Sequence, residues 1–275
     1  MDAVELRPLT LGEILDRTFT MYRRHFLFFV TLAGIFEIPT LAFTLYNVGV
    51  GTTTPSTFNV ADIATGFVIG LASIAISLTG FVLGNGGAVL AISEFYLGHT
   101  ITIGEALRRV FGRFWALLGA VLLGGIAILF AAILLVIPAI YLACCLLVIV
   151  PAVVIEKKGP GAAFSRSRDL THGFVWRAFL IIVLYELIAF AIGLAAGVPA
   201  GYIAAASGKK FQDMQWLATF QAVLSTFITI FVLPILQIAS SIFYFDLRVR
   251  KEAFDLQFMM NPDAPADDSR FLTEV

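Results

Sequence analysis

The sequence predicts an all-α membrane protein, a polytopic bundle of six transmembrane helices with short amphipathic helices at the membrane interface. Two observations lead to this class. Of the 275 residues, 59% are hydrophobic and only 13% are charged, a composition unlike that of ordinary soluble domains. The apolar residues gather in six stretches, each able to supply the roughly 17–25 residues that a helix needs to cross a ~30 Å hydrocarbon core. The stretches are 26–48, 63–95, 114–137, 139–155, 174–206 and 214–246.

The basic residues predict how the spans are oriented. Sixteen of the eighteen Lys and Arg residues lie before the first or third stretch, before or at the start of the fifth, or after the sixth. Because basic residues concentrate on the cytoplasmic side of a membrane, both termini and residues 97–113 and 156–173 are predicted to be cytoplasmic. Residues 49–61 and 207–213 are predicted to face outward. The expected location is the cell (inner or cytoplasmic) membrane.

A short helix is expected before each outward span. Thr10-Leu11-Gly12-Glu13 matches Thr102-Ile103-Gly104-Glu105, and both fit a capping box, in which Thr caps the first turn and Glu bonds back to it. The apolar residues behind each box keep helical spacing, so these helices are expected to lie in the membrane interface. A third, weaker copy begins at Gly159-Pro160-Gly161, with its proline at the first helical position.

This arrangement predicts a threefold internal repeat within one transmembrane domain, residues 1–258. The units are expected at about 10–100, 102–158 and 160–258, each made of an interfacial helix, an outward span and a returning span. The segment that follows, residues 259–275, contains two prolines and several acidic residues and is expected to be a disordered cytoplasmic tail.

The returning spans end in acidic residues, and the interfacial helices carry arginines at equivalent positions. A carboxylate at a helix C-terminus opposes the helix dipole, so a nearby cation should compensate it. We expect each arginine to hold one of the acids and so tie an interfacial helix to the bundle; contact with anionic lipid headgroups is the alternative. The acids are Glu94, Glu156 and Asp246, and the arginines are Arg17, Arg109 and Arg166.

Glu37, Asn85 and Glu186 form a candidate polar site inside the membrane. Each glutamate lies roughly 17 Å into its span at a rise of 1.5 Å per residue, near the middle of the bilayer. An ionised carboxylate at that depth is costly, so both are expected to face the bundle interior and to be protonated, hydrogen-bonded, or close to water or a cation. Asn85 lies in Gly84-Asn85-Gly86-Gly87, which predicts either a broken-helix binding site or a point of close packing.

The sequence carries no signature of catalysis or metal binding. It has no GxSxG, GxxxxGK[ST] or HExxH motif. The three histidines are far apart in sequence, so neither a metal site nor any other cofactor is expected. The adjacent Cys144 and Cys145 are expected to be reduced packing residues. A formal net charge of −1 gives no reason to expect nucleic-acid binding.

Three segments resemble a known membrane family. They are residues 9–16 (LTLGEILD), Glu156 followed by residues 159–160 (GP) and 166–173 (RSRDLTHG), and residues 245–252 (FDLRVRKE). Together they resemble the membrane domain found with some glycerophosphoryl diester phosphodiesterases and in many free-standing bacterial and archaeal membrane proteins of unknown function. In those enzymes the hydrolysis takes place in a separate soluble barrel of roughly 250 residues. None of its catalytic residues has a counterpart here, so the resemblance implies the membrane fold and no phosphodiesterase activity.

The sequence therefore favours a non-enzymatic multi-pass membrane protein, a scaffold or accessory module for membrane or lipid-handling partners. The alternative is a small transporter, channel or lipid-moving protein with a polar site between repeats, and an embedded enzyme comes third. A continuous polar cavity joining Glu37, Asn85 and Glu186 would distinguish them, because a transporter needs one. The expected partners are membrane lipids, through anionic headgroups at the cytoplasmic face; a protein partner or a homo-oligomer is left open.

Overall fold

The computed structural model describes residues 8–50, 60–206 and 215–252. Within these ranges the chain forms ten α-helices and no β-strand. The predicted tail, residues 259–275, and most of both predicted external connections lie outside the described residues. The helices are α1 (Leu11–Arg24), α2 (Phe26–Val50), α3 (Val60–Tyr96), α4 (Ile103–Phe111), α5 (Phe114–Leu134), α6 (Val136–Cys145), α7 (Ile149–Val154), α8 (Pro160–Thr171), α9 (Val175–Ala206) and α10 (Gln215–Glu252).

Six helical segments of the described chain are long and apolar enough to cross a membrane. They correspond to α2, α3, α5, α6 with α7, α9 and α10, with mean hydropathies between 2.0 and 2.7. The predicted class, an all-α multi-pass membrane protein, is confirmed. The predicted stretches 114–137 and 139–155 place the break between the third and fourth spans at Pro138; in the structure it lies three residues earlier, at Leu135. Proline fits the first turn of α6 because its missing N–H has no partner there in any case.

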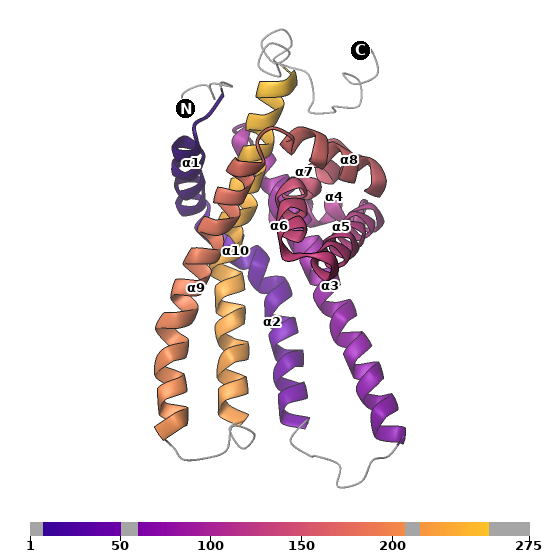
Figure 1. The fold of residues 1–275 in the computed structure, drawn as a ribbon, viewed down its shortest axis with the longest axis vertical. Coiled ribbons are helices and arrows are strands. Elements are labelled where there is room, and N and C mark those ends of the chain that lie inside the picture. The colour runs from indigo at the N-terminus through magenta and orange to yellow at the C-terminus, as the bar shows by residue number, and fades with distance from the viewer. Residues whose placement is uncertain (1–7, 51–59, 207–214, 253–275) are drawn as a thin grey trace.

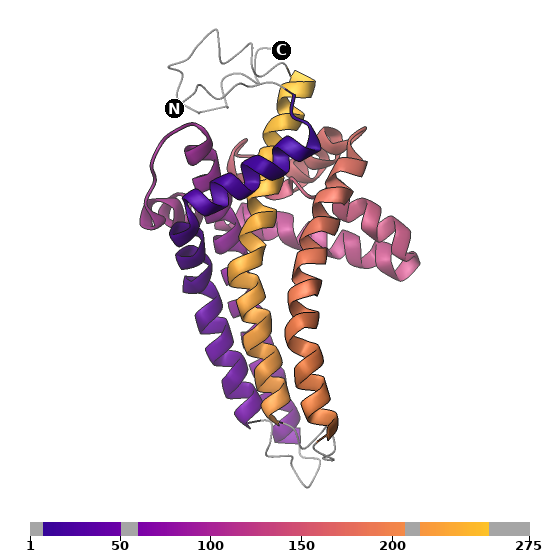
Figure 2. The ribbon, with the colours of Figure 1, turned by 90° about the vertical axis from the view of Figure 1, so that its left-hand side faces the viewer.

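The helices fall into two groups in space. α2, α3, α9 and α10 run along the long axis of the molecule, whereas α5 and α6 form a hairpin that lies across this axis near one end (Figures 1 and 2). α1 and α8 lie at that same end, where α10 finishes, and α4 packs there against α3. We call α1, α4 and α8, with the adjoining ends of α3, α7 and α10, the platform.

The platform helices begin as the sequence predicts. The Thr10 hydroxyl accepts a hydrogen bond from the Glu13 N–H, and the Glu13 carboxylate accepts one from the Thr10 N–H at 2.7 Å. Thr102 and Glu105 form the same box at the start of α4, and Pro160 occupies the first turn of α8. Each box satisfies two donors, which fixes where α1 and α4 begin.

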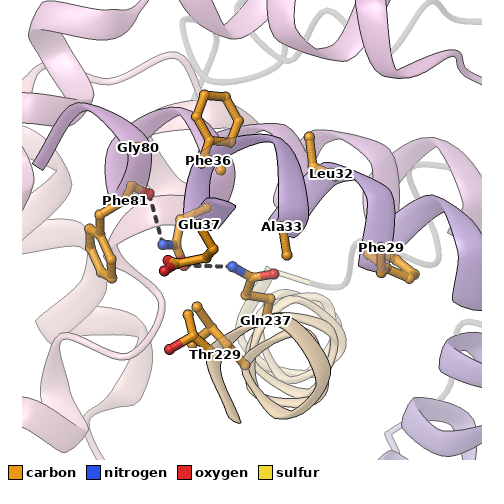
Figure 3. Close-up of a pocket in the computed structure, with 12 residues that line it drawn as sticks. Phe29, Leu32, Ala33, Phe36, Glu37, Gly80, Phe81, Thr229 and Gln237 are labelled. Carbon is orange, nitrogen blue, oxygen red and sulfur yellow. Dashed lines mark hydrogen bonds between the residues drawn. The ribbon is translucent and has the colours of Figure 1, made fainter. Parts of the chain in front are cut away.

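The segment Gly84-Asn85-Gly86-Gly87 does not break α3, which runs through it without interruption. Its glycines instead allow neighbouring helices to approach. A Cβ atom added at Gly86 would lie 2.7 Å from a methyl carbon of Val110 in α4. Gly80, just before this segment, faces Phe36 of α2 in the same way: a Cβ atom added at Gly80 would lie 3.3 Å from Cβ of Phe36 (Figure 3). The close-packing interpretation is confirmed, and the broken-helix interpretation is wrong for this segment.

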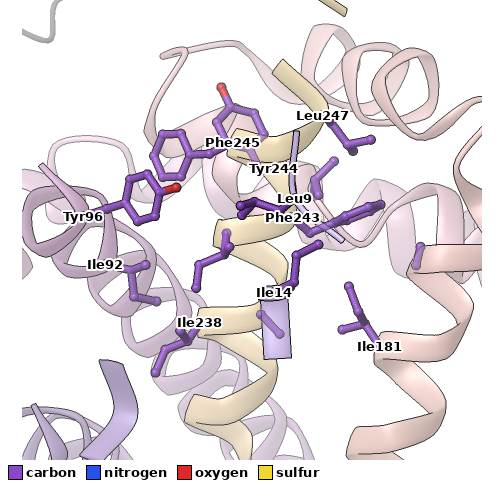
Figure 4. Packing of buried hydrophobic residues seen from close by; sticks show 14 of the residues in the cluster. Leu9, Ile14, Ile92, Tyr96, Ile181, Ile238, Phe243, Tyr244, Phe245 and Leu247 are labelled. Atoms are coloured by element: carbon purple, nitrogen blue, oxygen red, sulfur yellow. The ribbon is translucent and has the colours of Figure 1, made fainter. Parts of the chain in front are cut away.

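The largest buried cluster lies at the platform end, around the last third of α10 (Figure 4). Side chains from the segment before α1 and from α1, α3 and α9 surround it. Each large side chain enclosed in this way contributes roughly 1.5–3 kcal/mol when it is removed from water. The platform is therefore the most firmly packed part of the described chain. The cluster includes Ile238, Ile242, Phe243, Tyr244 and Leu247 of α10, with Leu9, Ile14, Ile92 and Ile181 around them.

The far halves of the long helices expose apolar side chains. Phe67 and Ile74 of α3 and Phe190 and Val198 of α9 are each more than 60% exposed. Contiguous apolar surface of this kind is rare on proteins that face water. Because acyl chains solvate such side chains well, this surface suits a hydrocarbon environment along α2, α3, α9 and α10.

The three predicted repeat units share one packing relation. The last helix of each unit rests on the platform helix of the next unit: α3 on α4, α7 on α8, and α10 on α1. The third unit thereby closes on the first. The middle unit differs from the others, since its hairpin lies across the long axis (Figures 1 and 2). The threefold repeat stays a prediction.

Candidate functional site

The first candidate pair joins the end of α3 to α4. Nη1 of Arg109 donates to Oε1 of Glu94 at 2.7 Å, and Nδ1 of His99 lies 3.1 Å from the other carboxylate oxygen. The Arg109 side chain is 55% exposed, so water and salt screen most of the attraction. This contact positions α4 but adds little to stability.

The second candidate pair is buried. Nε of Arg166 donates to both carboxylate oxygens of Glu156, at 2.9 and 2.8 Å. The Glu156 side chain has no exposed area. It also accepts a hydrogen bond from the Tyr244 hydroxyl at 2.8 Å, and Nζ of Lys158 lies 3.3 Å away. A buried carboxylate is tolerable only with such compensation, so these groups hold the end of α7 against α8 and α10.

The network continues from α8 to the last turn of α10. Arg166 also donates through Nη2 to Glu252, and Nε of Arg248 donates to the same carboxylate at 2.9 Å. Burial opposes the charge on Arg166, but the nearby charges and hydrogen bonds of Glu156 and Glu252 raise its pKa above the ordinary value. Arg166 is therefore a charged link among three helices.

Asp246, the third acid, binds the segment that leads into α1. The Leu9 N–H donates to Oδ1 at 2.7 Å, Nε of Arg250 donates to Oδ2 at 2.8 Å, and Nη1 of Arg177 lies 3.5 Å from Oδ2. Both arginines also donate to the carbonyl oxygen of Leu9, at 2.6 and 3.0 Å. These contacts hold the chain through main-chain atoms just before α1 begins.

Arg17 has a different partner from the predicted one. Its Nη1 donates to the Tyr96 hydroxyl at 3.1 Å. The carboxylate of Asp246 is already occupied by one N–H and two arginines, which leaves no need for a third cation there. The structure thus places two of the three arginines on acids of the predicted set, Arg109 on Glu94 and Arg166 on Glu156, whereas Arg17 contacts none of these acids.

Sequence reasoning missed several members of these clusters. Arg250 follows Asp246 by four residues, and Glu252 follows Arg248 by four, the spacing of ion pairs on one helix face. That spacing could have identified both pairs. Arg177 gave no such signal, because it lies 69 residues from Asp246 and meets it only through the fold.

Inside the apolar part of the bundle, Glu37 and Asn85 line one small cavity between α2, α3 and α10. Gln237 and Thr229 of α10 line it as well, and Figure 3 shows Glu37, Thr229 and Gln237 directed toward the same space. Nε2 of Gln237 donates to Oδ1 of Asn85 at 2.9 Å, and Nδ2 of Asn85 donates to the carbonyl oxygen of Phe81 at 2.8 Å. The Asn85 amide is therefore satisfied on both sides.

Glu186 lies apart from this cavity. Its side chain is exposed on α9, on the same face as the exposed Val183, Leu187 and Phe190. The cavity is lined by α2, α3 and α10 only. The expectation that Glu37 and Glu186 share one interior site is wrong, because equal depth in two helices does not set which way each helix face points.

The chemistry available to this site is limited by its size. The cavity has a volume of about 30 Å³, room for one or two water molecules, whereas sites for small organic ligands typically measure roughly 300–1,000 Å³. Within the described residues no group of three His, Cys, Asp or Glu side chains is arranged to hold a metal ion. The cavity suits a proton or water beside one carboxyl and two amides.

Comparison of the chain with protein-family models, with curated proteins and with solved structures found no match.

Proposed function

We propose that the protein is a non-enzymatic membrane scaffold or accessory module, with the platform on the cytoplasmic side, that serves membrane or lipid-handling partners. One observation carries this proposal: the most strongly held acids of the platform are engaged in joining helices. Glu156 and Asp246 each bind cations from two or more segments. Groups enclosed in this way are suited to holding a shape and are poorly placed to reach a substrate.

The intramembrane cavity supports the same proposal. A transporter of small solutes needs a polar path, whereas the cavity at Glu37 and Asn85 is not lined by Glu186 and has room for only one or two water molecules. The bundle therefore has the character of a packed support for the platform.

Other platform side chains provide a surface for lipid headgroups. Arg23, Arg24, Arg108 and Arg168 are exposed at this end. Trp115 and Trp176, which open α5 and α9, are 79% and 67% exposed. Arginine favours anionic headgroups and tryptophan favours the membrane–water interface. These residues take the place of Arg17, Arg109 and Arg166 as the headgroup contacts of the proposal.

Native mass spectrometry of the purified protein with defined lipids tests the headgroup contact. Replacement of Arg108 and Arg168 by Glu should reduce the number of retained anionic lipids without changing retained zwitterionic lipids. Replacement of Lys209 and Lys210 by Glu serves as the matched double charge reversal, because these two lysines belong to the connection predicted to face outward. If all variants retained the same number of anionic lipids, the proposed headgroup surface would be contradicted.

Transport is the second candidate, and the carboxyl of Glu37 beside the cavity is the observation that favours it. In proteoliposomes that contain a pH-sensitive dye, the wild-type protein and Glu37→Gln should give the same slow proton leak. A proton or sodium flux that requires Glu37 would overturn the scaffold proposal in favour of transport.

A further inference from the structure

The direction of the α5–α6 hairpin does not match that of the other apolar helices. Figures 1 and 2 show it lying across the long axis in two views at right angles, while α2, α3, α9 and α10 run along that axis. Since the long apolar helices set the direction of the membrane normal, the hairpin lies close to the membrane plane. It does so at the platform end.

The base of the hairpin is fixed to the platform. A Cβ atom added at Gly119 of α5 would lie 2.7 Å from Cγ of Pro160, so the start of α8 packs directly on α5. The carbonyl oxygen of Cys145, at the end of α6, accepts hydrogen bonds from the hydroxyls of Ser167 and Thr171 at 2.8 and 3.1 Å. These contacts set the direction in which the hairpin leaves the platform.

The part that projects from this base is short. Gly124 is the last buried residue of α5, and a turn after Cys145 separates α6 from α7. Each arm beyond the base therefore has about ten residues, or roughly 15 Å at 1.5 Å per residue. Even a hairpin standing upright with that reach would be too short to cross a ~30 Å hydrocarbon core from the platform.

The tip is apolar on every side. Six consecutive residues, 132–137, are exposed, and Leu134 and Ile137 are each 79% exposed. From residue 114 to residue 155 the sequence contains no charged side chain. A surface made for another protein is usually one-sided, whereas a helix that is apolar all round suits lipid. A turn that emerged from the far side of a membrane would also meet water, and this turn has no polar residue to place there.

We propose that α5 and α6 form a re-entrant hairpin, which enters the bilayer from the platform side, lies among the acyl chains of that leaflet and returns without crossing. The partner of this surface is lipid hydrocarbon. The length and apolarity of α5 and of α6 with α7 are sufficient for crossing, but their direction and the apolar turn at Leu135 place the tip within one leaflet. The hairpin then acts as a lateral anchor that holds the platform at a fixed depth.

Single-cysteine labelling of the full-length protein in sealed vesicles tests this placement. Leu135→Cys probes the tip, Ile203→Cys near the far end of α9 marks the far side, and Gly104→Cys in α4 marks the platform side. The two native cysteines, which are buried, are replaced by Ala in every variant, and this cysteine-free protein gives the background labelling. A membrane-impermeant maleimide should label positions 203 and 104 from opposite sides and should leave position 135 unlabelled from either side.

A second measurement gives the depth of the tip. A fluorophore introduced at position 135 through a membrane-permeant reagent should be quenched by nitroxide-labelled lipids exchanged into the platform-side leaflet alone, and not by iodide in the water. Labelling of position 135 from the far side, as at position 203, would show that the hairpin crosses. Labelling from the platform side would place it in water. Protection from all reagents without lipid quenching would show that protein, such as a second copy, covers the tip. Each of these three results overturns the proposal.

Discussion

Nε of Arg166 in α8 donates to both carboxylate oxygens of Glu156, which stands just beyond the end of α7, and the acid has no exposed side-chain area. The two residues are ten positions apart, so the contact closes a small loop and also connects with α10 through Tyr244 and Glu252. The pair therefore sits where three helices of the platform meet.

Glu156→Ala should strongly destabilise the protein. Removal of one partner from a buried pair leaves an uncompensated charge and typically costs about 3–5 kcal/mol. The lower end, about 3 kcal/mol, is expected because Arg166 keeps Glu252. The shift in the unfolding midpoint in mixed micelles measures this. The double variant Glu156→Leu, Arg166→Met should recover much of the loss; a double variant as unstable as Glu156→Ala would contradict the ion-pair explanation.

Arg109→Ala should lower the free energy of unfolding only slightly. It breaks an exposed ion pair and is therefore the control for the buried pair. The contact of Arg109 with Glu94, at 2.7 Å, is as short as the contact of Arg166 with Glu156, yet Arg109 is 55% exposed. Exposed pairs contribute about 0.2–1 kcal/mol, and the effect should shrink further in high salt. If Arg109→Ala lost as much stability as Glu156→Ala under the same unfolding conditions, exposure to solvent would not explain the difference between the two pairs.

Asp246→Ala should release the segment before α1 more than it unfolds the bundle. Without the carboxylate, the Leu9 N–H loses its acceptor, and Arg177 and Arg250 lose the charge between them. Hydrogen–deuterium exchange of residues 9–14 should rise severalfold, while the middle of α3 keeps its protection. Arg17→Ala, which removes a hydrogen bond to Tyr96 instead, is the control and should leave Leu9 exchange nearly unchanged. Equal exchange in the two variants would contradict the role given to Asp246.

Asn85→Leu should be destabilising, and Asn85→Leu with Gln237→Leu should be less so. The single change leaves the Gln237 amide in an apolar setting without its acceptor, and an unsatisfied buried polar group costs about 1–3 kcal/mol. The double change removes both polar groups together. Unfolding midpoints of the two variants, compared with that of Gln237→Leu, give the coupling between the amides. Additive losses would mean that the hydrogen bond does not connect α3 to α10.

The capping box of α4 should weaken in acid. The hydrogen bond from the Thr102 N–H, followed by that from its hydroxyl, lowers the pKa of Glu105 below its ordinary value of 4.5. The pKa of Glu105 is lower in the folded than in the unfolded state, so the capping box stabilises the fold fully at a pH above the unfolded-state pKa. This stabilisation is lost as the pH falls through the folded-state pKa. Amide exchange of α4 in the wild type, relative to Glu105→Ala, should therefore show protection near neutral pH that disappears in acid. A constant ratio between the two proteins over that range would exclude Glu105 as the titrating group.

The sequence by itself determined the class of the protein and the local structure of the platform. Composition and six apolar stretches were sufficient for an all-α membrane protein, because a backbone in lipid must satisfy its own hydrogen bonds and does so as helices. The first residues of α1 and α4 could also be predicted from the sequence, since a capping box involves residues only three positions apart. The pairs Glu94 with Arg109 and Glu156 with Arg166 were accessible for a similar reason, because each joins segments close in sequence.

The tertiary structure decided everything that depends on which face of a helix meets which neighbour. Glu37 and Glu186 lie at about the same distance from the start of their spans. Glu37 nevertheless lines a cavity, whereas Glu186 is exposed on α9. Arg17 meets Tyr96 and not an acid, and Asp246 meets Leu9 from 237 residues away. The direction of the α5–α6 hairpin could not be predicted from the sequence either (Figure 2). A helix that is apolar on every side carries no periodic signal of its orientation, so only its packing against α8 and its neighbours sets the direction.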